Sequence, residues 1–281
     1  MASNFRIIST NDADAATLTS SAFLAGLPVT NLQLEGRSRV ARTTNATGSK
    51  AINGNWAEAK LVSALVLYGC NFTSEATLRI ECFDGANQTG ATVYDSGVIP
   101  ALEALGWGDF DWGLEPWGDT VFVGWQTAYA VHWFTATVGA LSFRITLEDP
   151  SNGDGYIQVK RLLIGAYFEP EVNPDFGMQL NWVSNEVQTR TLAGSIRTDA
   201  QVKFRELTGS LAGLADQERA RFFDICRVVG LASECFVSVY PELGGVEERD
   251  HAMLCKFTGQ LPTMQTTNPG RHGAQFKLSE V

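Results

Sequence analysis

The stretch Leu141–Gly165, LSFRITLEDPSNGDGYIQVKRLLIG, decides the fold class of this chain. Its first part alternates apolar and polar side chains, which is the period-2 pattern of a strand with one buried face. Asp149–Gly155 follows, a run of residues that stabilise turns. A second run, Tyr156–Gly165, is again rich in β-forming residues. We therefore predict a β-hairpin, two strands joined by a polar turn.

Short strands continue through the part of the chain before this hairpin. Four further runs are rich in β-forming residues: Arg39–Thr43, Leu61–Cys70, Ala76–Phe83 and Thr92–Gly97. The run Leu61–Cys70 is almost continuously apolar, which is typical of a strand buried on both faces. Strands at intervals of roughly 8–15 residues, separated by Gly, Asn, Asp and Ser, predict a sandwich or jelly roll.

The acidic run Glu169–Asp175 contains two prolines and predicts a boundary between two domains. Beyond it, Asp216–Val229 repeats apolar side chains at three- and four-residue steps, which predicts one amphipathic helix that Gly230 ends. The remaining predicted strands are Gln188–Arg197, Val202–Thr208, Cys235–Tyr240, Ala252–Gln260 and Ala274–Val281. The fold class is therefore mainly β: an N-terminal jelly-roll β-sandwich over residues 1–170 and a C-terminal α+β domain over residues 171–281.

The composition is that of a folded protein with an acidic surface. The 281 residues are 44% hydrophobic and 19% charged, and the formal net charge is −10. Such a surface repels phosphates, so the composition argues against a nucleic-acid-binding function. The first residues, MASNFRIISTNDADAATL, lack the cationic start and apolar core of a secretory signal, and no apolar run approaches the roughly 20 residues of a membrane span. Five cysteines in this setting predict free thiols made in a reducing compartment.

A tryptophan-rich segment interrupts the first domain. Five of the seven tryptophans lie between Gly106 and Phe134: Trp107, Trp112, Trp117, Trp125 and Trp133. Three interpretations stay open. The indoles form a platform that stacks on sugar rings, they anchor a protein interface, or they fold back and cover an open end of the sandwich. These five residues are the candidate glycan or interface contacts.

The sequence holds no motif of a known catalytic centre. Its three histidines, His132, His251 and His272, do not lie in a nucleophile elbow or in a zinc-protease pattern. We therefore expect a non-enzymatic protein without a cofactor.

Two groups of residues are candidates for a metal site. Asp149, Asn152 and Asp154 offer oxygen ligands for Ca²⁺ on one tight turn, but without the spacing of an EF-hand, so a metal-free turn is the favoured interpretation. Cys226, Cys235, Cys255 and His251 offer ligands for zinc or an iron–sulfur cluster. Their spacing fits no tight motif, so buried free thiols are favoured here.

Several short motifs of the first 170 residues resemble the galactose-binding-like (discoidin-type) jelly roll found in tail proteins of tailed bacteriophages. The matching stretches are Leu27–Leu32, Asn55–Leu65, Leu67–Thr73, Tyr94–Gly97 and Arg144–Gly165. The second part resembles the β-rich assembly domains of phages with long flexible tails, through the helix Asp216–Gly230, the strand after it and the terminal strand Phe276–Val281.

The resemblance implies a structural component of the virion, at the distal tail ring or baseplate. Its expected partners are further copies of itself in a ring, the tube, hub and tape-measure proteins, and host surface glycans. It would be made in the host cytoplasm and end in the virion tail. Some tail-tip proteins bind an iron–sulfur cluster through four cysteines, and the second part of this chain has three. The alternative function is a carbohydrate-binding adhesin in which the jelly roll contacts host glycans.

Overall fold

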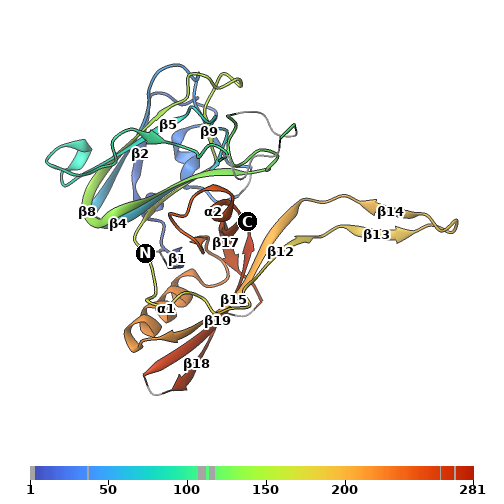
Figure 1. The fold of residues 1–281 in the computed structure, drawn as a ribbon. Coiled ribbons are helices and arrows are strands. Elements are labelled where there is room, and N and C mark those ends of the chain that lie inside the picture. The colour runs from blue at the N-terminus through green and yellow to red at the C-terminus, as the bar shows by residue number, and fades with distance from the viewer. Residues whose placement is uncertain (1–3, 37, 107–111, 114–117, 260, 269) are drawn as a thin grey trace. The chain divides into compact units, whose positions relative to one another are not determined.

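The computed structural model describes residues 4–36, 38–106, 112–113, 118–259, 261–268 and 270–281 (Figure 1). The chain forms two compact units. The first contains Met1–Glu169 and Phe236–Ala252, and the second contains Pro170–Cys235 and Met253–Val281. The predicted ranges 1–170 and 171–281 did not anticipate the return of Phe236–Ala252 to the first unit.

Two long strands, β4 (Lys50–Cys70) and β8 (Ala128–Glu148), form the framework of the first unit and pair antiparallel with each other. The register of this pairing shifts between Asn55 and Lys60 of β4. It shifts again at residues 134–137 of β8, which lie between the pairs Val62–Val138 and Ala64–Trp133. Extra residues in one strand bend a ribbon locally, and Figure 1 shows the two strands bending together. Each strand therefore contributes one half to either layer of an antiparallel β-sandwich.

The first layer joins the N-terminal half of β4 and the C-terminal half of β8. It also contains β2 (Thr17–Thr19), β5 (Thr77–Phe83), β6 (Thr92–Asp95) and β7 (Ile99–Pro100). The second layer joins the other halves of β4 and β8 with β10 (Arg161–Gly165). Val62–Cys70 of β4 is buried throughout, as its almost continuous apolar run predicts, whereas Leu61, the first residue of the predicted strand, is 63% exposed. The mainly β fold with a β-sandwich is confirmed.

The predicted hairpin at Leu141–Gly165 is wrong in its pairing, although both strands exist. The C-terminal half of β8 pairs with β4 and β5, whereas β10 pairs with the other half of β4, in the second layer. Between them, β9 (Gln158–Val159) pairs with β3 (Ala41–Arg42). The turn after Glu148 thus crosses from one layer to the other, a choice that periodicity alone does not encode.

The segment that returns to the first unit carries one strand and one short helix. β1 (Arg6–Ile8) pairs with both β11 (Tyr167–Phe168) and β16 (Cys235–Ser238). Phe236 of β16 packs against Tyr129 and Trp133 of β8, with ring centroids 5.6 and 6.4 Å apart. The helix α2 (Gly245–His251) follows; it was not predicted, because its seven residues are too few to show a helical repeat.

The second unit is a sheet with one helix. Its strands run in the order β17 (Ala252–Phe257), β19 (Arg271–Glu280), β15 (Lys203–Leu214) and β12 (Gln179–Ser184), and β18 (Thr263–Asn268) also pairs with β19. Arg205, 2% exposed, forms an ion pair of 2.7 Å with Glu280 across this sheet.

The helix α1 (Asp216–Val229) has the bounds that the sequence predicts and contacts β15 and β19. In the first turn of α1, the Glu218 carboxylate accepts a hydrogen bond from the Ala215 amide. At the other end, Gly230 ends the helix with φ 56°. Phe222, Cys226 and Val229 are buried, whereas Phe223, which the pattern had placed on the same face, is 55% exposed. The buried stripe of α1 is therefore narrower than predicted.

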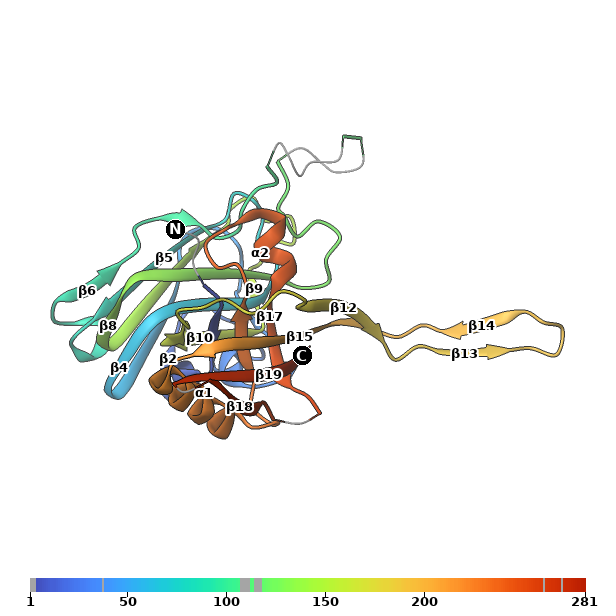
Figure 2. The ribbon, with the colours of Figure 1, turned by 60° about the horizontal axis from the view of Figure 1, so that its bottom comes forward.

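The predicted strand Gln188–Arg197 is wrong: this part of the chain is a two-stranded ribbon. β13 (Val187–Arg190) and β14 (Ile196–Asp199) pair with each other around a turn in which Gly194 has φ 84°. Figure 2 shows this ribbon continuing from the ends of β12 and β15. Every residue of both strands is exposed.

Gly54 tests the packing at the centre of the first layer. A Cβ added to this residue of β4 would lie 2.1 Å from the Phe143 ring of β8. We expect Gly54→Ala to lower the free energy of unfolding by about 1–3 kcal/mol, because overpacking forces the ring and the strands apart. Gly139→Ala is the matched control, since a Cβ added at this position of β8 would have nothing within 4 Å. Equal unfolding midpoints in urea for the two variants would contradict this packing.

Candidate functional site

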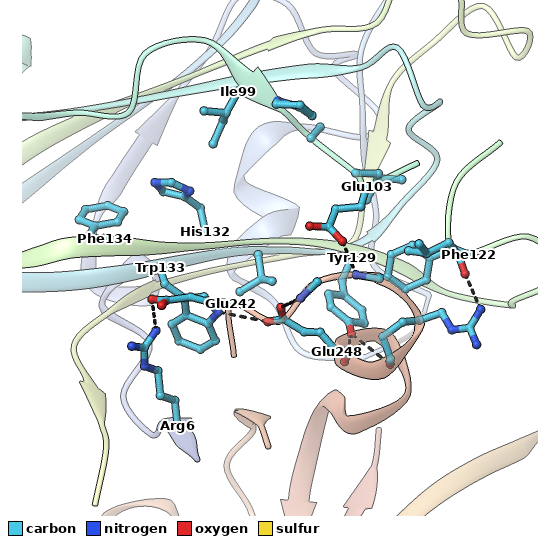
Figure 3. A pocket seen from close by; sticks show the side chains of 18 of the residues that line it. Arg6, Ile99, Glu103, Phe122, Tyr129, His132, Trp133, Phe134, Glu242 and Glu248 are labelled. Atoms are coloured by element: carbon cyan, nitrogen blue, oxygen red, sulfur yellow. Dashed lines mark hydrogen bonds and ion pairs between the residues drawn. The ribbon is translucent and has the colours of Figure 1, made fainter. Parts of the chain in front are cut away.

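The first unit contains a cavity of about 750 Å³. Three segments line most of it: residues 99–103, which begin in β7, the part of β8 between Tyr129 and Thr135, and residues 242–249, which include the start of α2 (Figure 3). Arg6, Val121, Phe122 and Tyr167 complete the lining. These segments are far apart in the sequence. The strand β1 carries Arg6 and pairs with β11, which contains Tyr167, and with β16, which precedes residues 242–249.

One wall of the cavity carries the rings of three consecutive residues of β8, His132, Trp133 and Phe134. Behind this wall, Phe134 stacks on Tyr94 of β6, which is not part of the lining, with ring centroids 3.9 Å apart and an angle of 4°. The Tyr94 hydroxyl lies 2.6 Å from His132 Nε2, and burial lowers the pKa of His132, which keeps the ring neutral near pH 7. Figure 3 shows His132 and Phe134 side by side, with Ile99 above them.

The second group of lining residues is three glutamates, Glu103 from residues 99–103 and Glu242 and Glu248 from residues 242–249. Glu248 is 8% exposed and accepts hydrogen bonds from Trp133 Nε1 at 3.2 Å and from the Gly244 amide at 3.1 Å. Burial raises its pKa. Glu103 accepts a hydrogen bond from the Gly245 amide. A Cβ at Gly244, where φ is 71°, would lie 2.5 Å from a carboxylate oxygen of Glu103, so this approach requires glycine.

The third glutamate, Glu242, accepts a hydrogen bond of 2.7 Å from Arg6. Arg6 also binds Glu169 at 2.8 Å, and its guanidinium lies over the rings of Tyr167 and Trp133 at 4.4 and 5.1 Å. Burial opposes the charged form of Arg6, but the hydrogen bonds to Glu242 and Glu169 outweigh it and raise its pKa. The arginine therefore stays charged and joins β1 to the cavity wall.

The second arginine of the lining, Arg249, fixes α2 against the segment that precedes β8. Its guanidinium donates to the Val121 carbonyl at 2.6 Å and to Asp250 at 2.8 Å, and it lies 4.6 Å from the centre of the Trp125 ring. The Tyr129 hydroxyl lies 3.1 Å from the carbonyl oxygens of both Glu248 and Arg249. These polar contacts fix the position of the short helix α2, which has no long apolar face of its own to pack against β8.

The tryptophan-rich segment contributes to this cavity only in part. Trp133 is buried, lines the cavity and binds Glu248 through its indole N–H. Trp125 is half-buried beneath Arg249, and Trp112 is 70% exposed. Trp107 and Trp117 lie outside the described residues. The sequence interpretation missed Glu103, Glu242, Glu248 and Arg6, because no local pattern connects residues separated by more than 100 positions.

The candidate calcium ligands form a hydrogen-bonded turn. Asp149, which is fully buried, accepts from the Thr73 amide at 3.0 Å, from the Thr73 hydroxyl at 2.5 Å and from Asn152 Nδ2 at 2.9 Å. Asn152 Oδ1 in turn accepts from the Asp154 amide at 3.0 Å, and Asp154 Oδ2 accepts from Asn71 at 2.8 Å. These contacts give the three side chains a role in fixing the layer-crossing turn.

The candidate cysteine ligands are buried free thiols. Cys235 and Cys255 approach each other with their sulfur atoms 3.7 Å apart, and all five cysteines are free. Burial raises the pKa of Cys226 to about 12, so it carries no thiolate near neutral pH. Among the residues that the structure describes, no group of three or more His, Cys, Asp or Glu side chains is arranged to hold a metal ion. Within the same residues, no helix is long and apolar enough to cross a membrane.

Comparison with known proteins finds likenesses only among solved structures. No family model matches the chain, and no curated protein matches its sequence. Chitosan-binding module 1 of a chitosanase/glucanase from Paenibacillus sp. IK-5 is 14% identical over 56% of this chain and 99% of that chain, with a TM-score of 0.37. The family 32 CBM of NanJ from C. perfringens, solved with galactose, is 12% identical over 57% of this chain and 98% of that chain, also with a TM-score of 0.37.

A third similar structure is the lectin domain of lectinolysin, solved with Lewis B antigen. It is 12% identical over 55% of this chain and 95% of that chain, with a TM-score of 0.36. Identities and TM-scores of this size assign no function to the chain, so a functional argument has to come from its own residues.

The Asp149 turn yields a test of the calcium interpretation. We expect Asp149→Ala to lower the free energy of unfolding by at least about 2 kcal/mol, because it removes a fully buried carboxylate and leaves the part-buried Thr73 amide without its acceptor. Asp154→Ala, which removes one exposed contact, should cost about 1 kcal/mol or less. Millimolar Ca²⁺ or a chelator should leave the wild-type melting temperature unchanged. A melting temperature that rises with Ca²⁺ in the wild type but not in Asp149→Ala would establish a calcium site instead.

Proposed function

We propose that the first unit binds carbohydrate in the cavity between residues 99–103, β8 and residues 242–249. The observation that carries the proposal is the combination of aromatic rings of β8, Trp133 and Phe134, with the carboxylates of Glu103, Glu242 and Glu248 in one cavity of about 750 Å³. Cavities of roughly 300–1,000 Å³ hold small ligands. Sugar rings present apolar C–H faces to aromatic rings and hydroxyl donors to carboxylates, which accept hydrogen bonds at both oxygens.

Binding without turnover fits the state of the acidic groups. The carboxylates of Glu248 and Glu103 accept hydrogen bonds from Trp133 and from the amides of Gly244 and Gly245, which belong to the fold itself. A wall held in this way orients a ligand, whereas a general acid and base require a pair of groups directed at one scissile bond. We therefore propose a binding protein and expect no hydrolysis of the sugars that it binds.

Filling the cavity tests the carbohydrate proposal. Ile99 lines the cavity, and its neighbour Val98 is 71% exposed and lies outside the lining. On a glycan array with the full chain, we expect wild type and Val98→Trp to bind the same glycans. Ile99→Trp should reduce their affinity at least about tenfold, because the indole occupies the ligand volume. Absence of glycan binding by the wild type, or equal binding by Ile99→Trp, would refute the proposal.

A second candidate function, a structural subunit of a bacteriophage tail tip, is supported by the β13–β14 ribbon. Val187, Ile196 and Leu192 of this ribbon are exposed by 59%, 55% and 111%. An isolated two-stranded ribbon is marginally stable in water, so a neighbouring molecule that covers it would stabilise it. We propose that neighbour to be a second copy of this chain, in a ring that also contacts tube, hub and tape-measure proteins in the virion.

The oligomeric state tests this second candidate. We expect the full chain to sediment as an oligomer at micromolar concentration, and the triple variant Val187→Ser, Leu192→Ser, Ile196→Ser to sediment as a 30.5 kDa monomer. The loss follows from removing the apolar area that association buries. Leu61→Ser with Val98→Ser removes exposed apolar residues of the first unit and should leave the oligomer intact. A monomeric wild type, or an oligomeric triple variant, would contradict a role for the ribbon in assembly.

A further inference from the structure

We infer that the cavity selects sugars that carry a free amine over neutral sugars and excludes acidic ones. This inference rests on the proposed carbohydrate binding and adds the chemical class of the ligand. Its basis is the charge of the lining. Glu103, Glu242 and Glu248 stand against two arginines, Arg6 and Arg249.

Both arginines form ion pairs or hydrogen bonds with other residues of the protein. Arg6 holds Glu169 and Glu242 at 2.8 and 2.7 Å. Arg249 holds Asp250 and the Val121 carbonyl, and its guanidinium faces the Trp125 ring. An anionic ligand would have to compete with these carboxylates for a guanidinium whose donors are engaged in close contacts. The loss of such a contact in a buried setting is costly.

The acidic side of the lining has the opposite character. Glu103 is exposed and accepts one hydrogen bond from the Gly245 amide, whereas a carboxylate can accept about four. Glu248 accepts a hydrogen bond from the amide of the adjacent glycine, Gly244. Burial raises the pKa of Glu248, and the negative charge of Glu103 adds to that rise, so Glu248 contributes less of the negative charge than the exposed Glu103. Figure 3 shows Glu103 reaching over the start of α2 toward Glu248.

The remaining titratable group of the wall does not offset this charge. His132 is neutral near pH 7, because burial lowers its pKa, and its Nε2 lies 2.6 Å from the Tyr94 hydroxyl. The cavity therefore offers an aromatic face together with carboxylate acceptors and a negative potential. An ammonium group on a sugar ring suits both the carboxylate acceptors and the negative potential, since it donates three hydrogen bonds and carries a positive charge.

The test measures the affinity of the full chain for three tetrasaccharides by isothermal titration calorimetry at pH 6. The three are a glucosamine oligomer, its N-acetylated form and an oligogalacturonate. We expect the glucosamine oligomer to bind about tenfold more tightly than the N-acetylated form, and the oligogalacturonate not to bind. Glu103→Gln should weaken the glucosamine oligomer about five- to tenfold and change the N-acetylated form less than twofold, because only the amine loses its ionic partner.

Two controls separate this selectivity from attraction to an acidic protein in general. Glu58→Gln removes the same charge from an exposed position of the first unit, outside the lining, and should leave all affinities unchanged. Ile99→Trp should weaken binding of the glucosamine oligomer at least about tenfold. Affinity that is unchanged in Ile99→Trp, or that falls equally in Glu58→Gln and Glu103→Gln, would overturn the inference. Equal affinity for the two glucosamine forms overturns the inference but leaves the proposed function intact, whereas no binding of any glycan removes both.

Discussion

The pairing of β4 with β8 is the interaction on which the first unit depends. Each of the two strands is 21 residues long, and they pair antiparallel along their length. The pairing is interrupted at register shifts, where one strand has more residues than the segment opposite it. Because each interruption bends the ribbon, the same two strands supply hydrogen-bonding edges to both layers of the sandwich. The core residues Ile52 and Leu65 belong to one strand yet are buried in different layers.

The bend also creates the conditions for the cavity. In its C-terminal half, β8 is enclosed between β4 and β5, whereas the described pairings of Ala128–Trp133 are with β4 alone. Residues 99–103 and 242–249 line the same cavity as this part of β8, and that cavity is the proposed binding site. The candidate site thus includes the part of β8 that β5 does not pair with.

Buried polar groups hold this arrangement together, and each of them has a partner. Arg6 connects β1 to Glu169 and Glu242, Glu248 connects α2 to Trp133, and Arg249 connects it to Val121. Buried charges are costly unless they are paired and hydrogen-bonded. The contacts that satisfy the arginines also stabilise the wall, and the proposed selectivity follows from the carboxylates that remain in the lining. In the second unit, the ribbon β13–β14 exposes the apolar side chains Val187 and Ile196, which the proposed assembly would cover.

The amino-acid sequence by itself determined the local elements of this protein. Period-2 alternation predicted the strand before Asp149, and β-forming residues predicted the strand after it. The almost continuous apolar run predicted the buried part of β4, and three- and four-residue steps predicted α1 with its bounds. Only the tertiary structure decided which edges meet: β10 pairs with β4 and not with β8, and Trp133 meets a glutamate 115 positions away. The reason is physical. Periodicity records which side of a segment is buried, whereas the partner of a strand edge or of a buried charge is set by packing between segments that are distant in the chain.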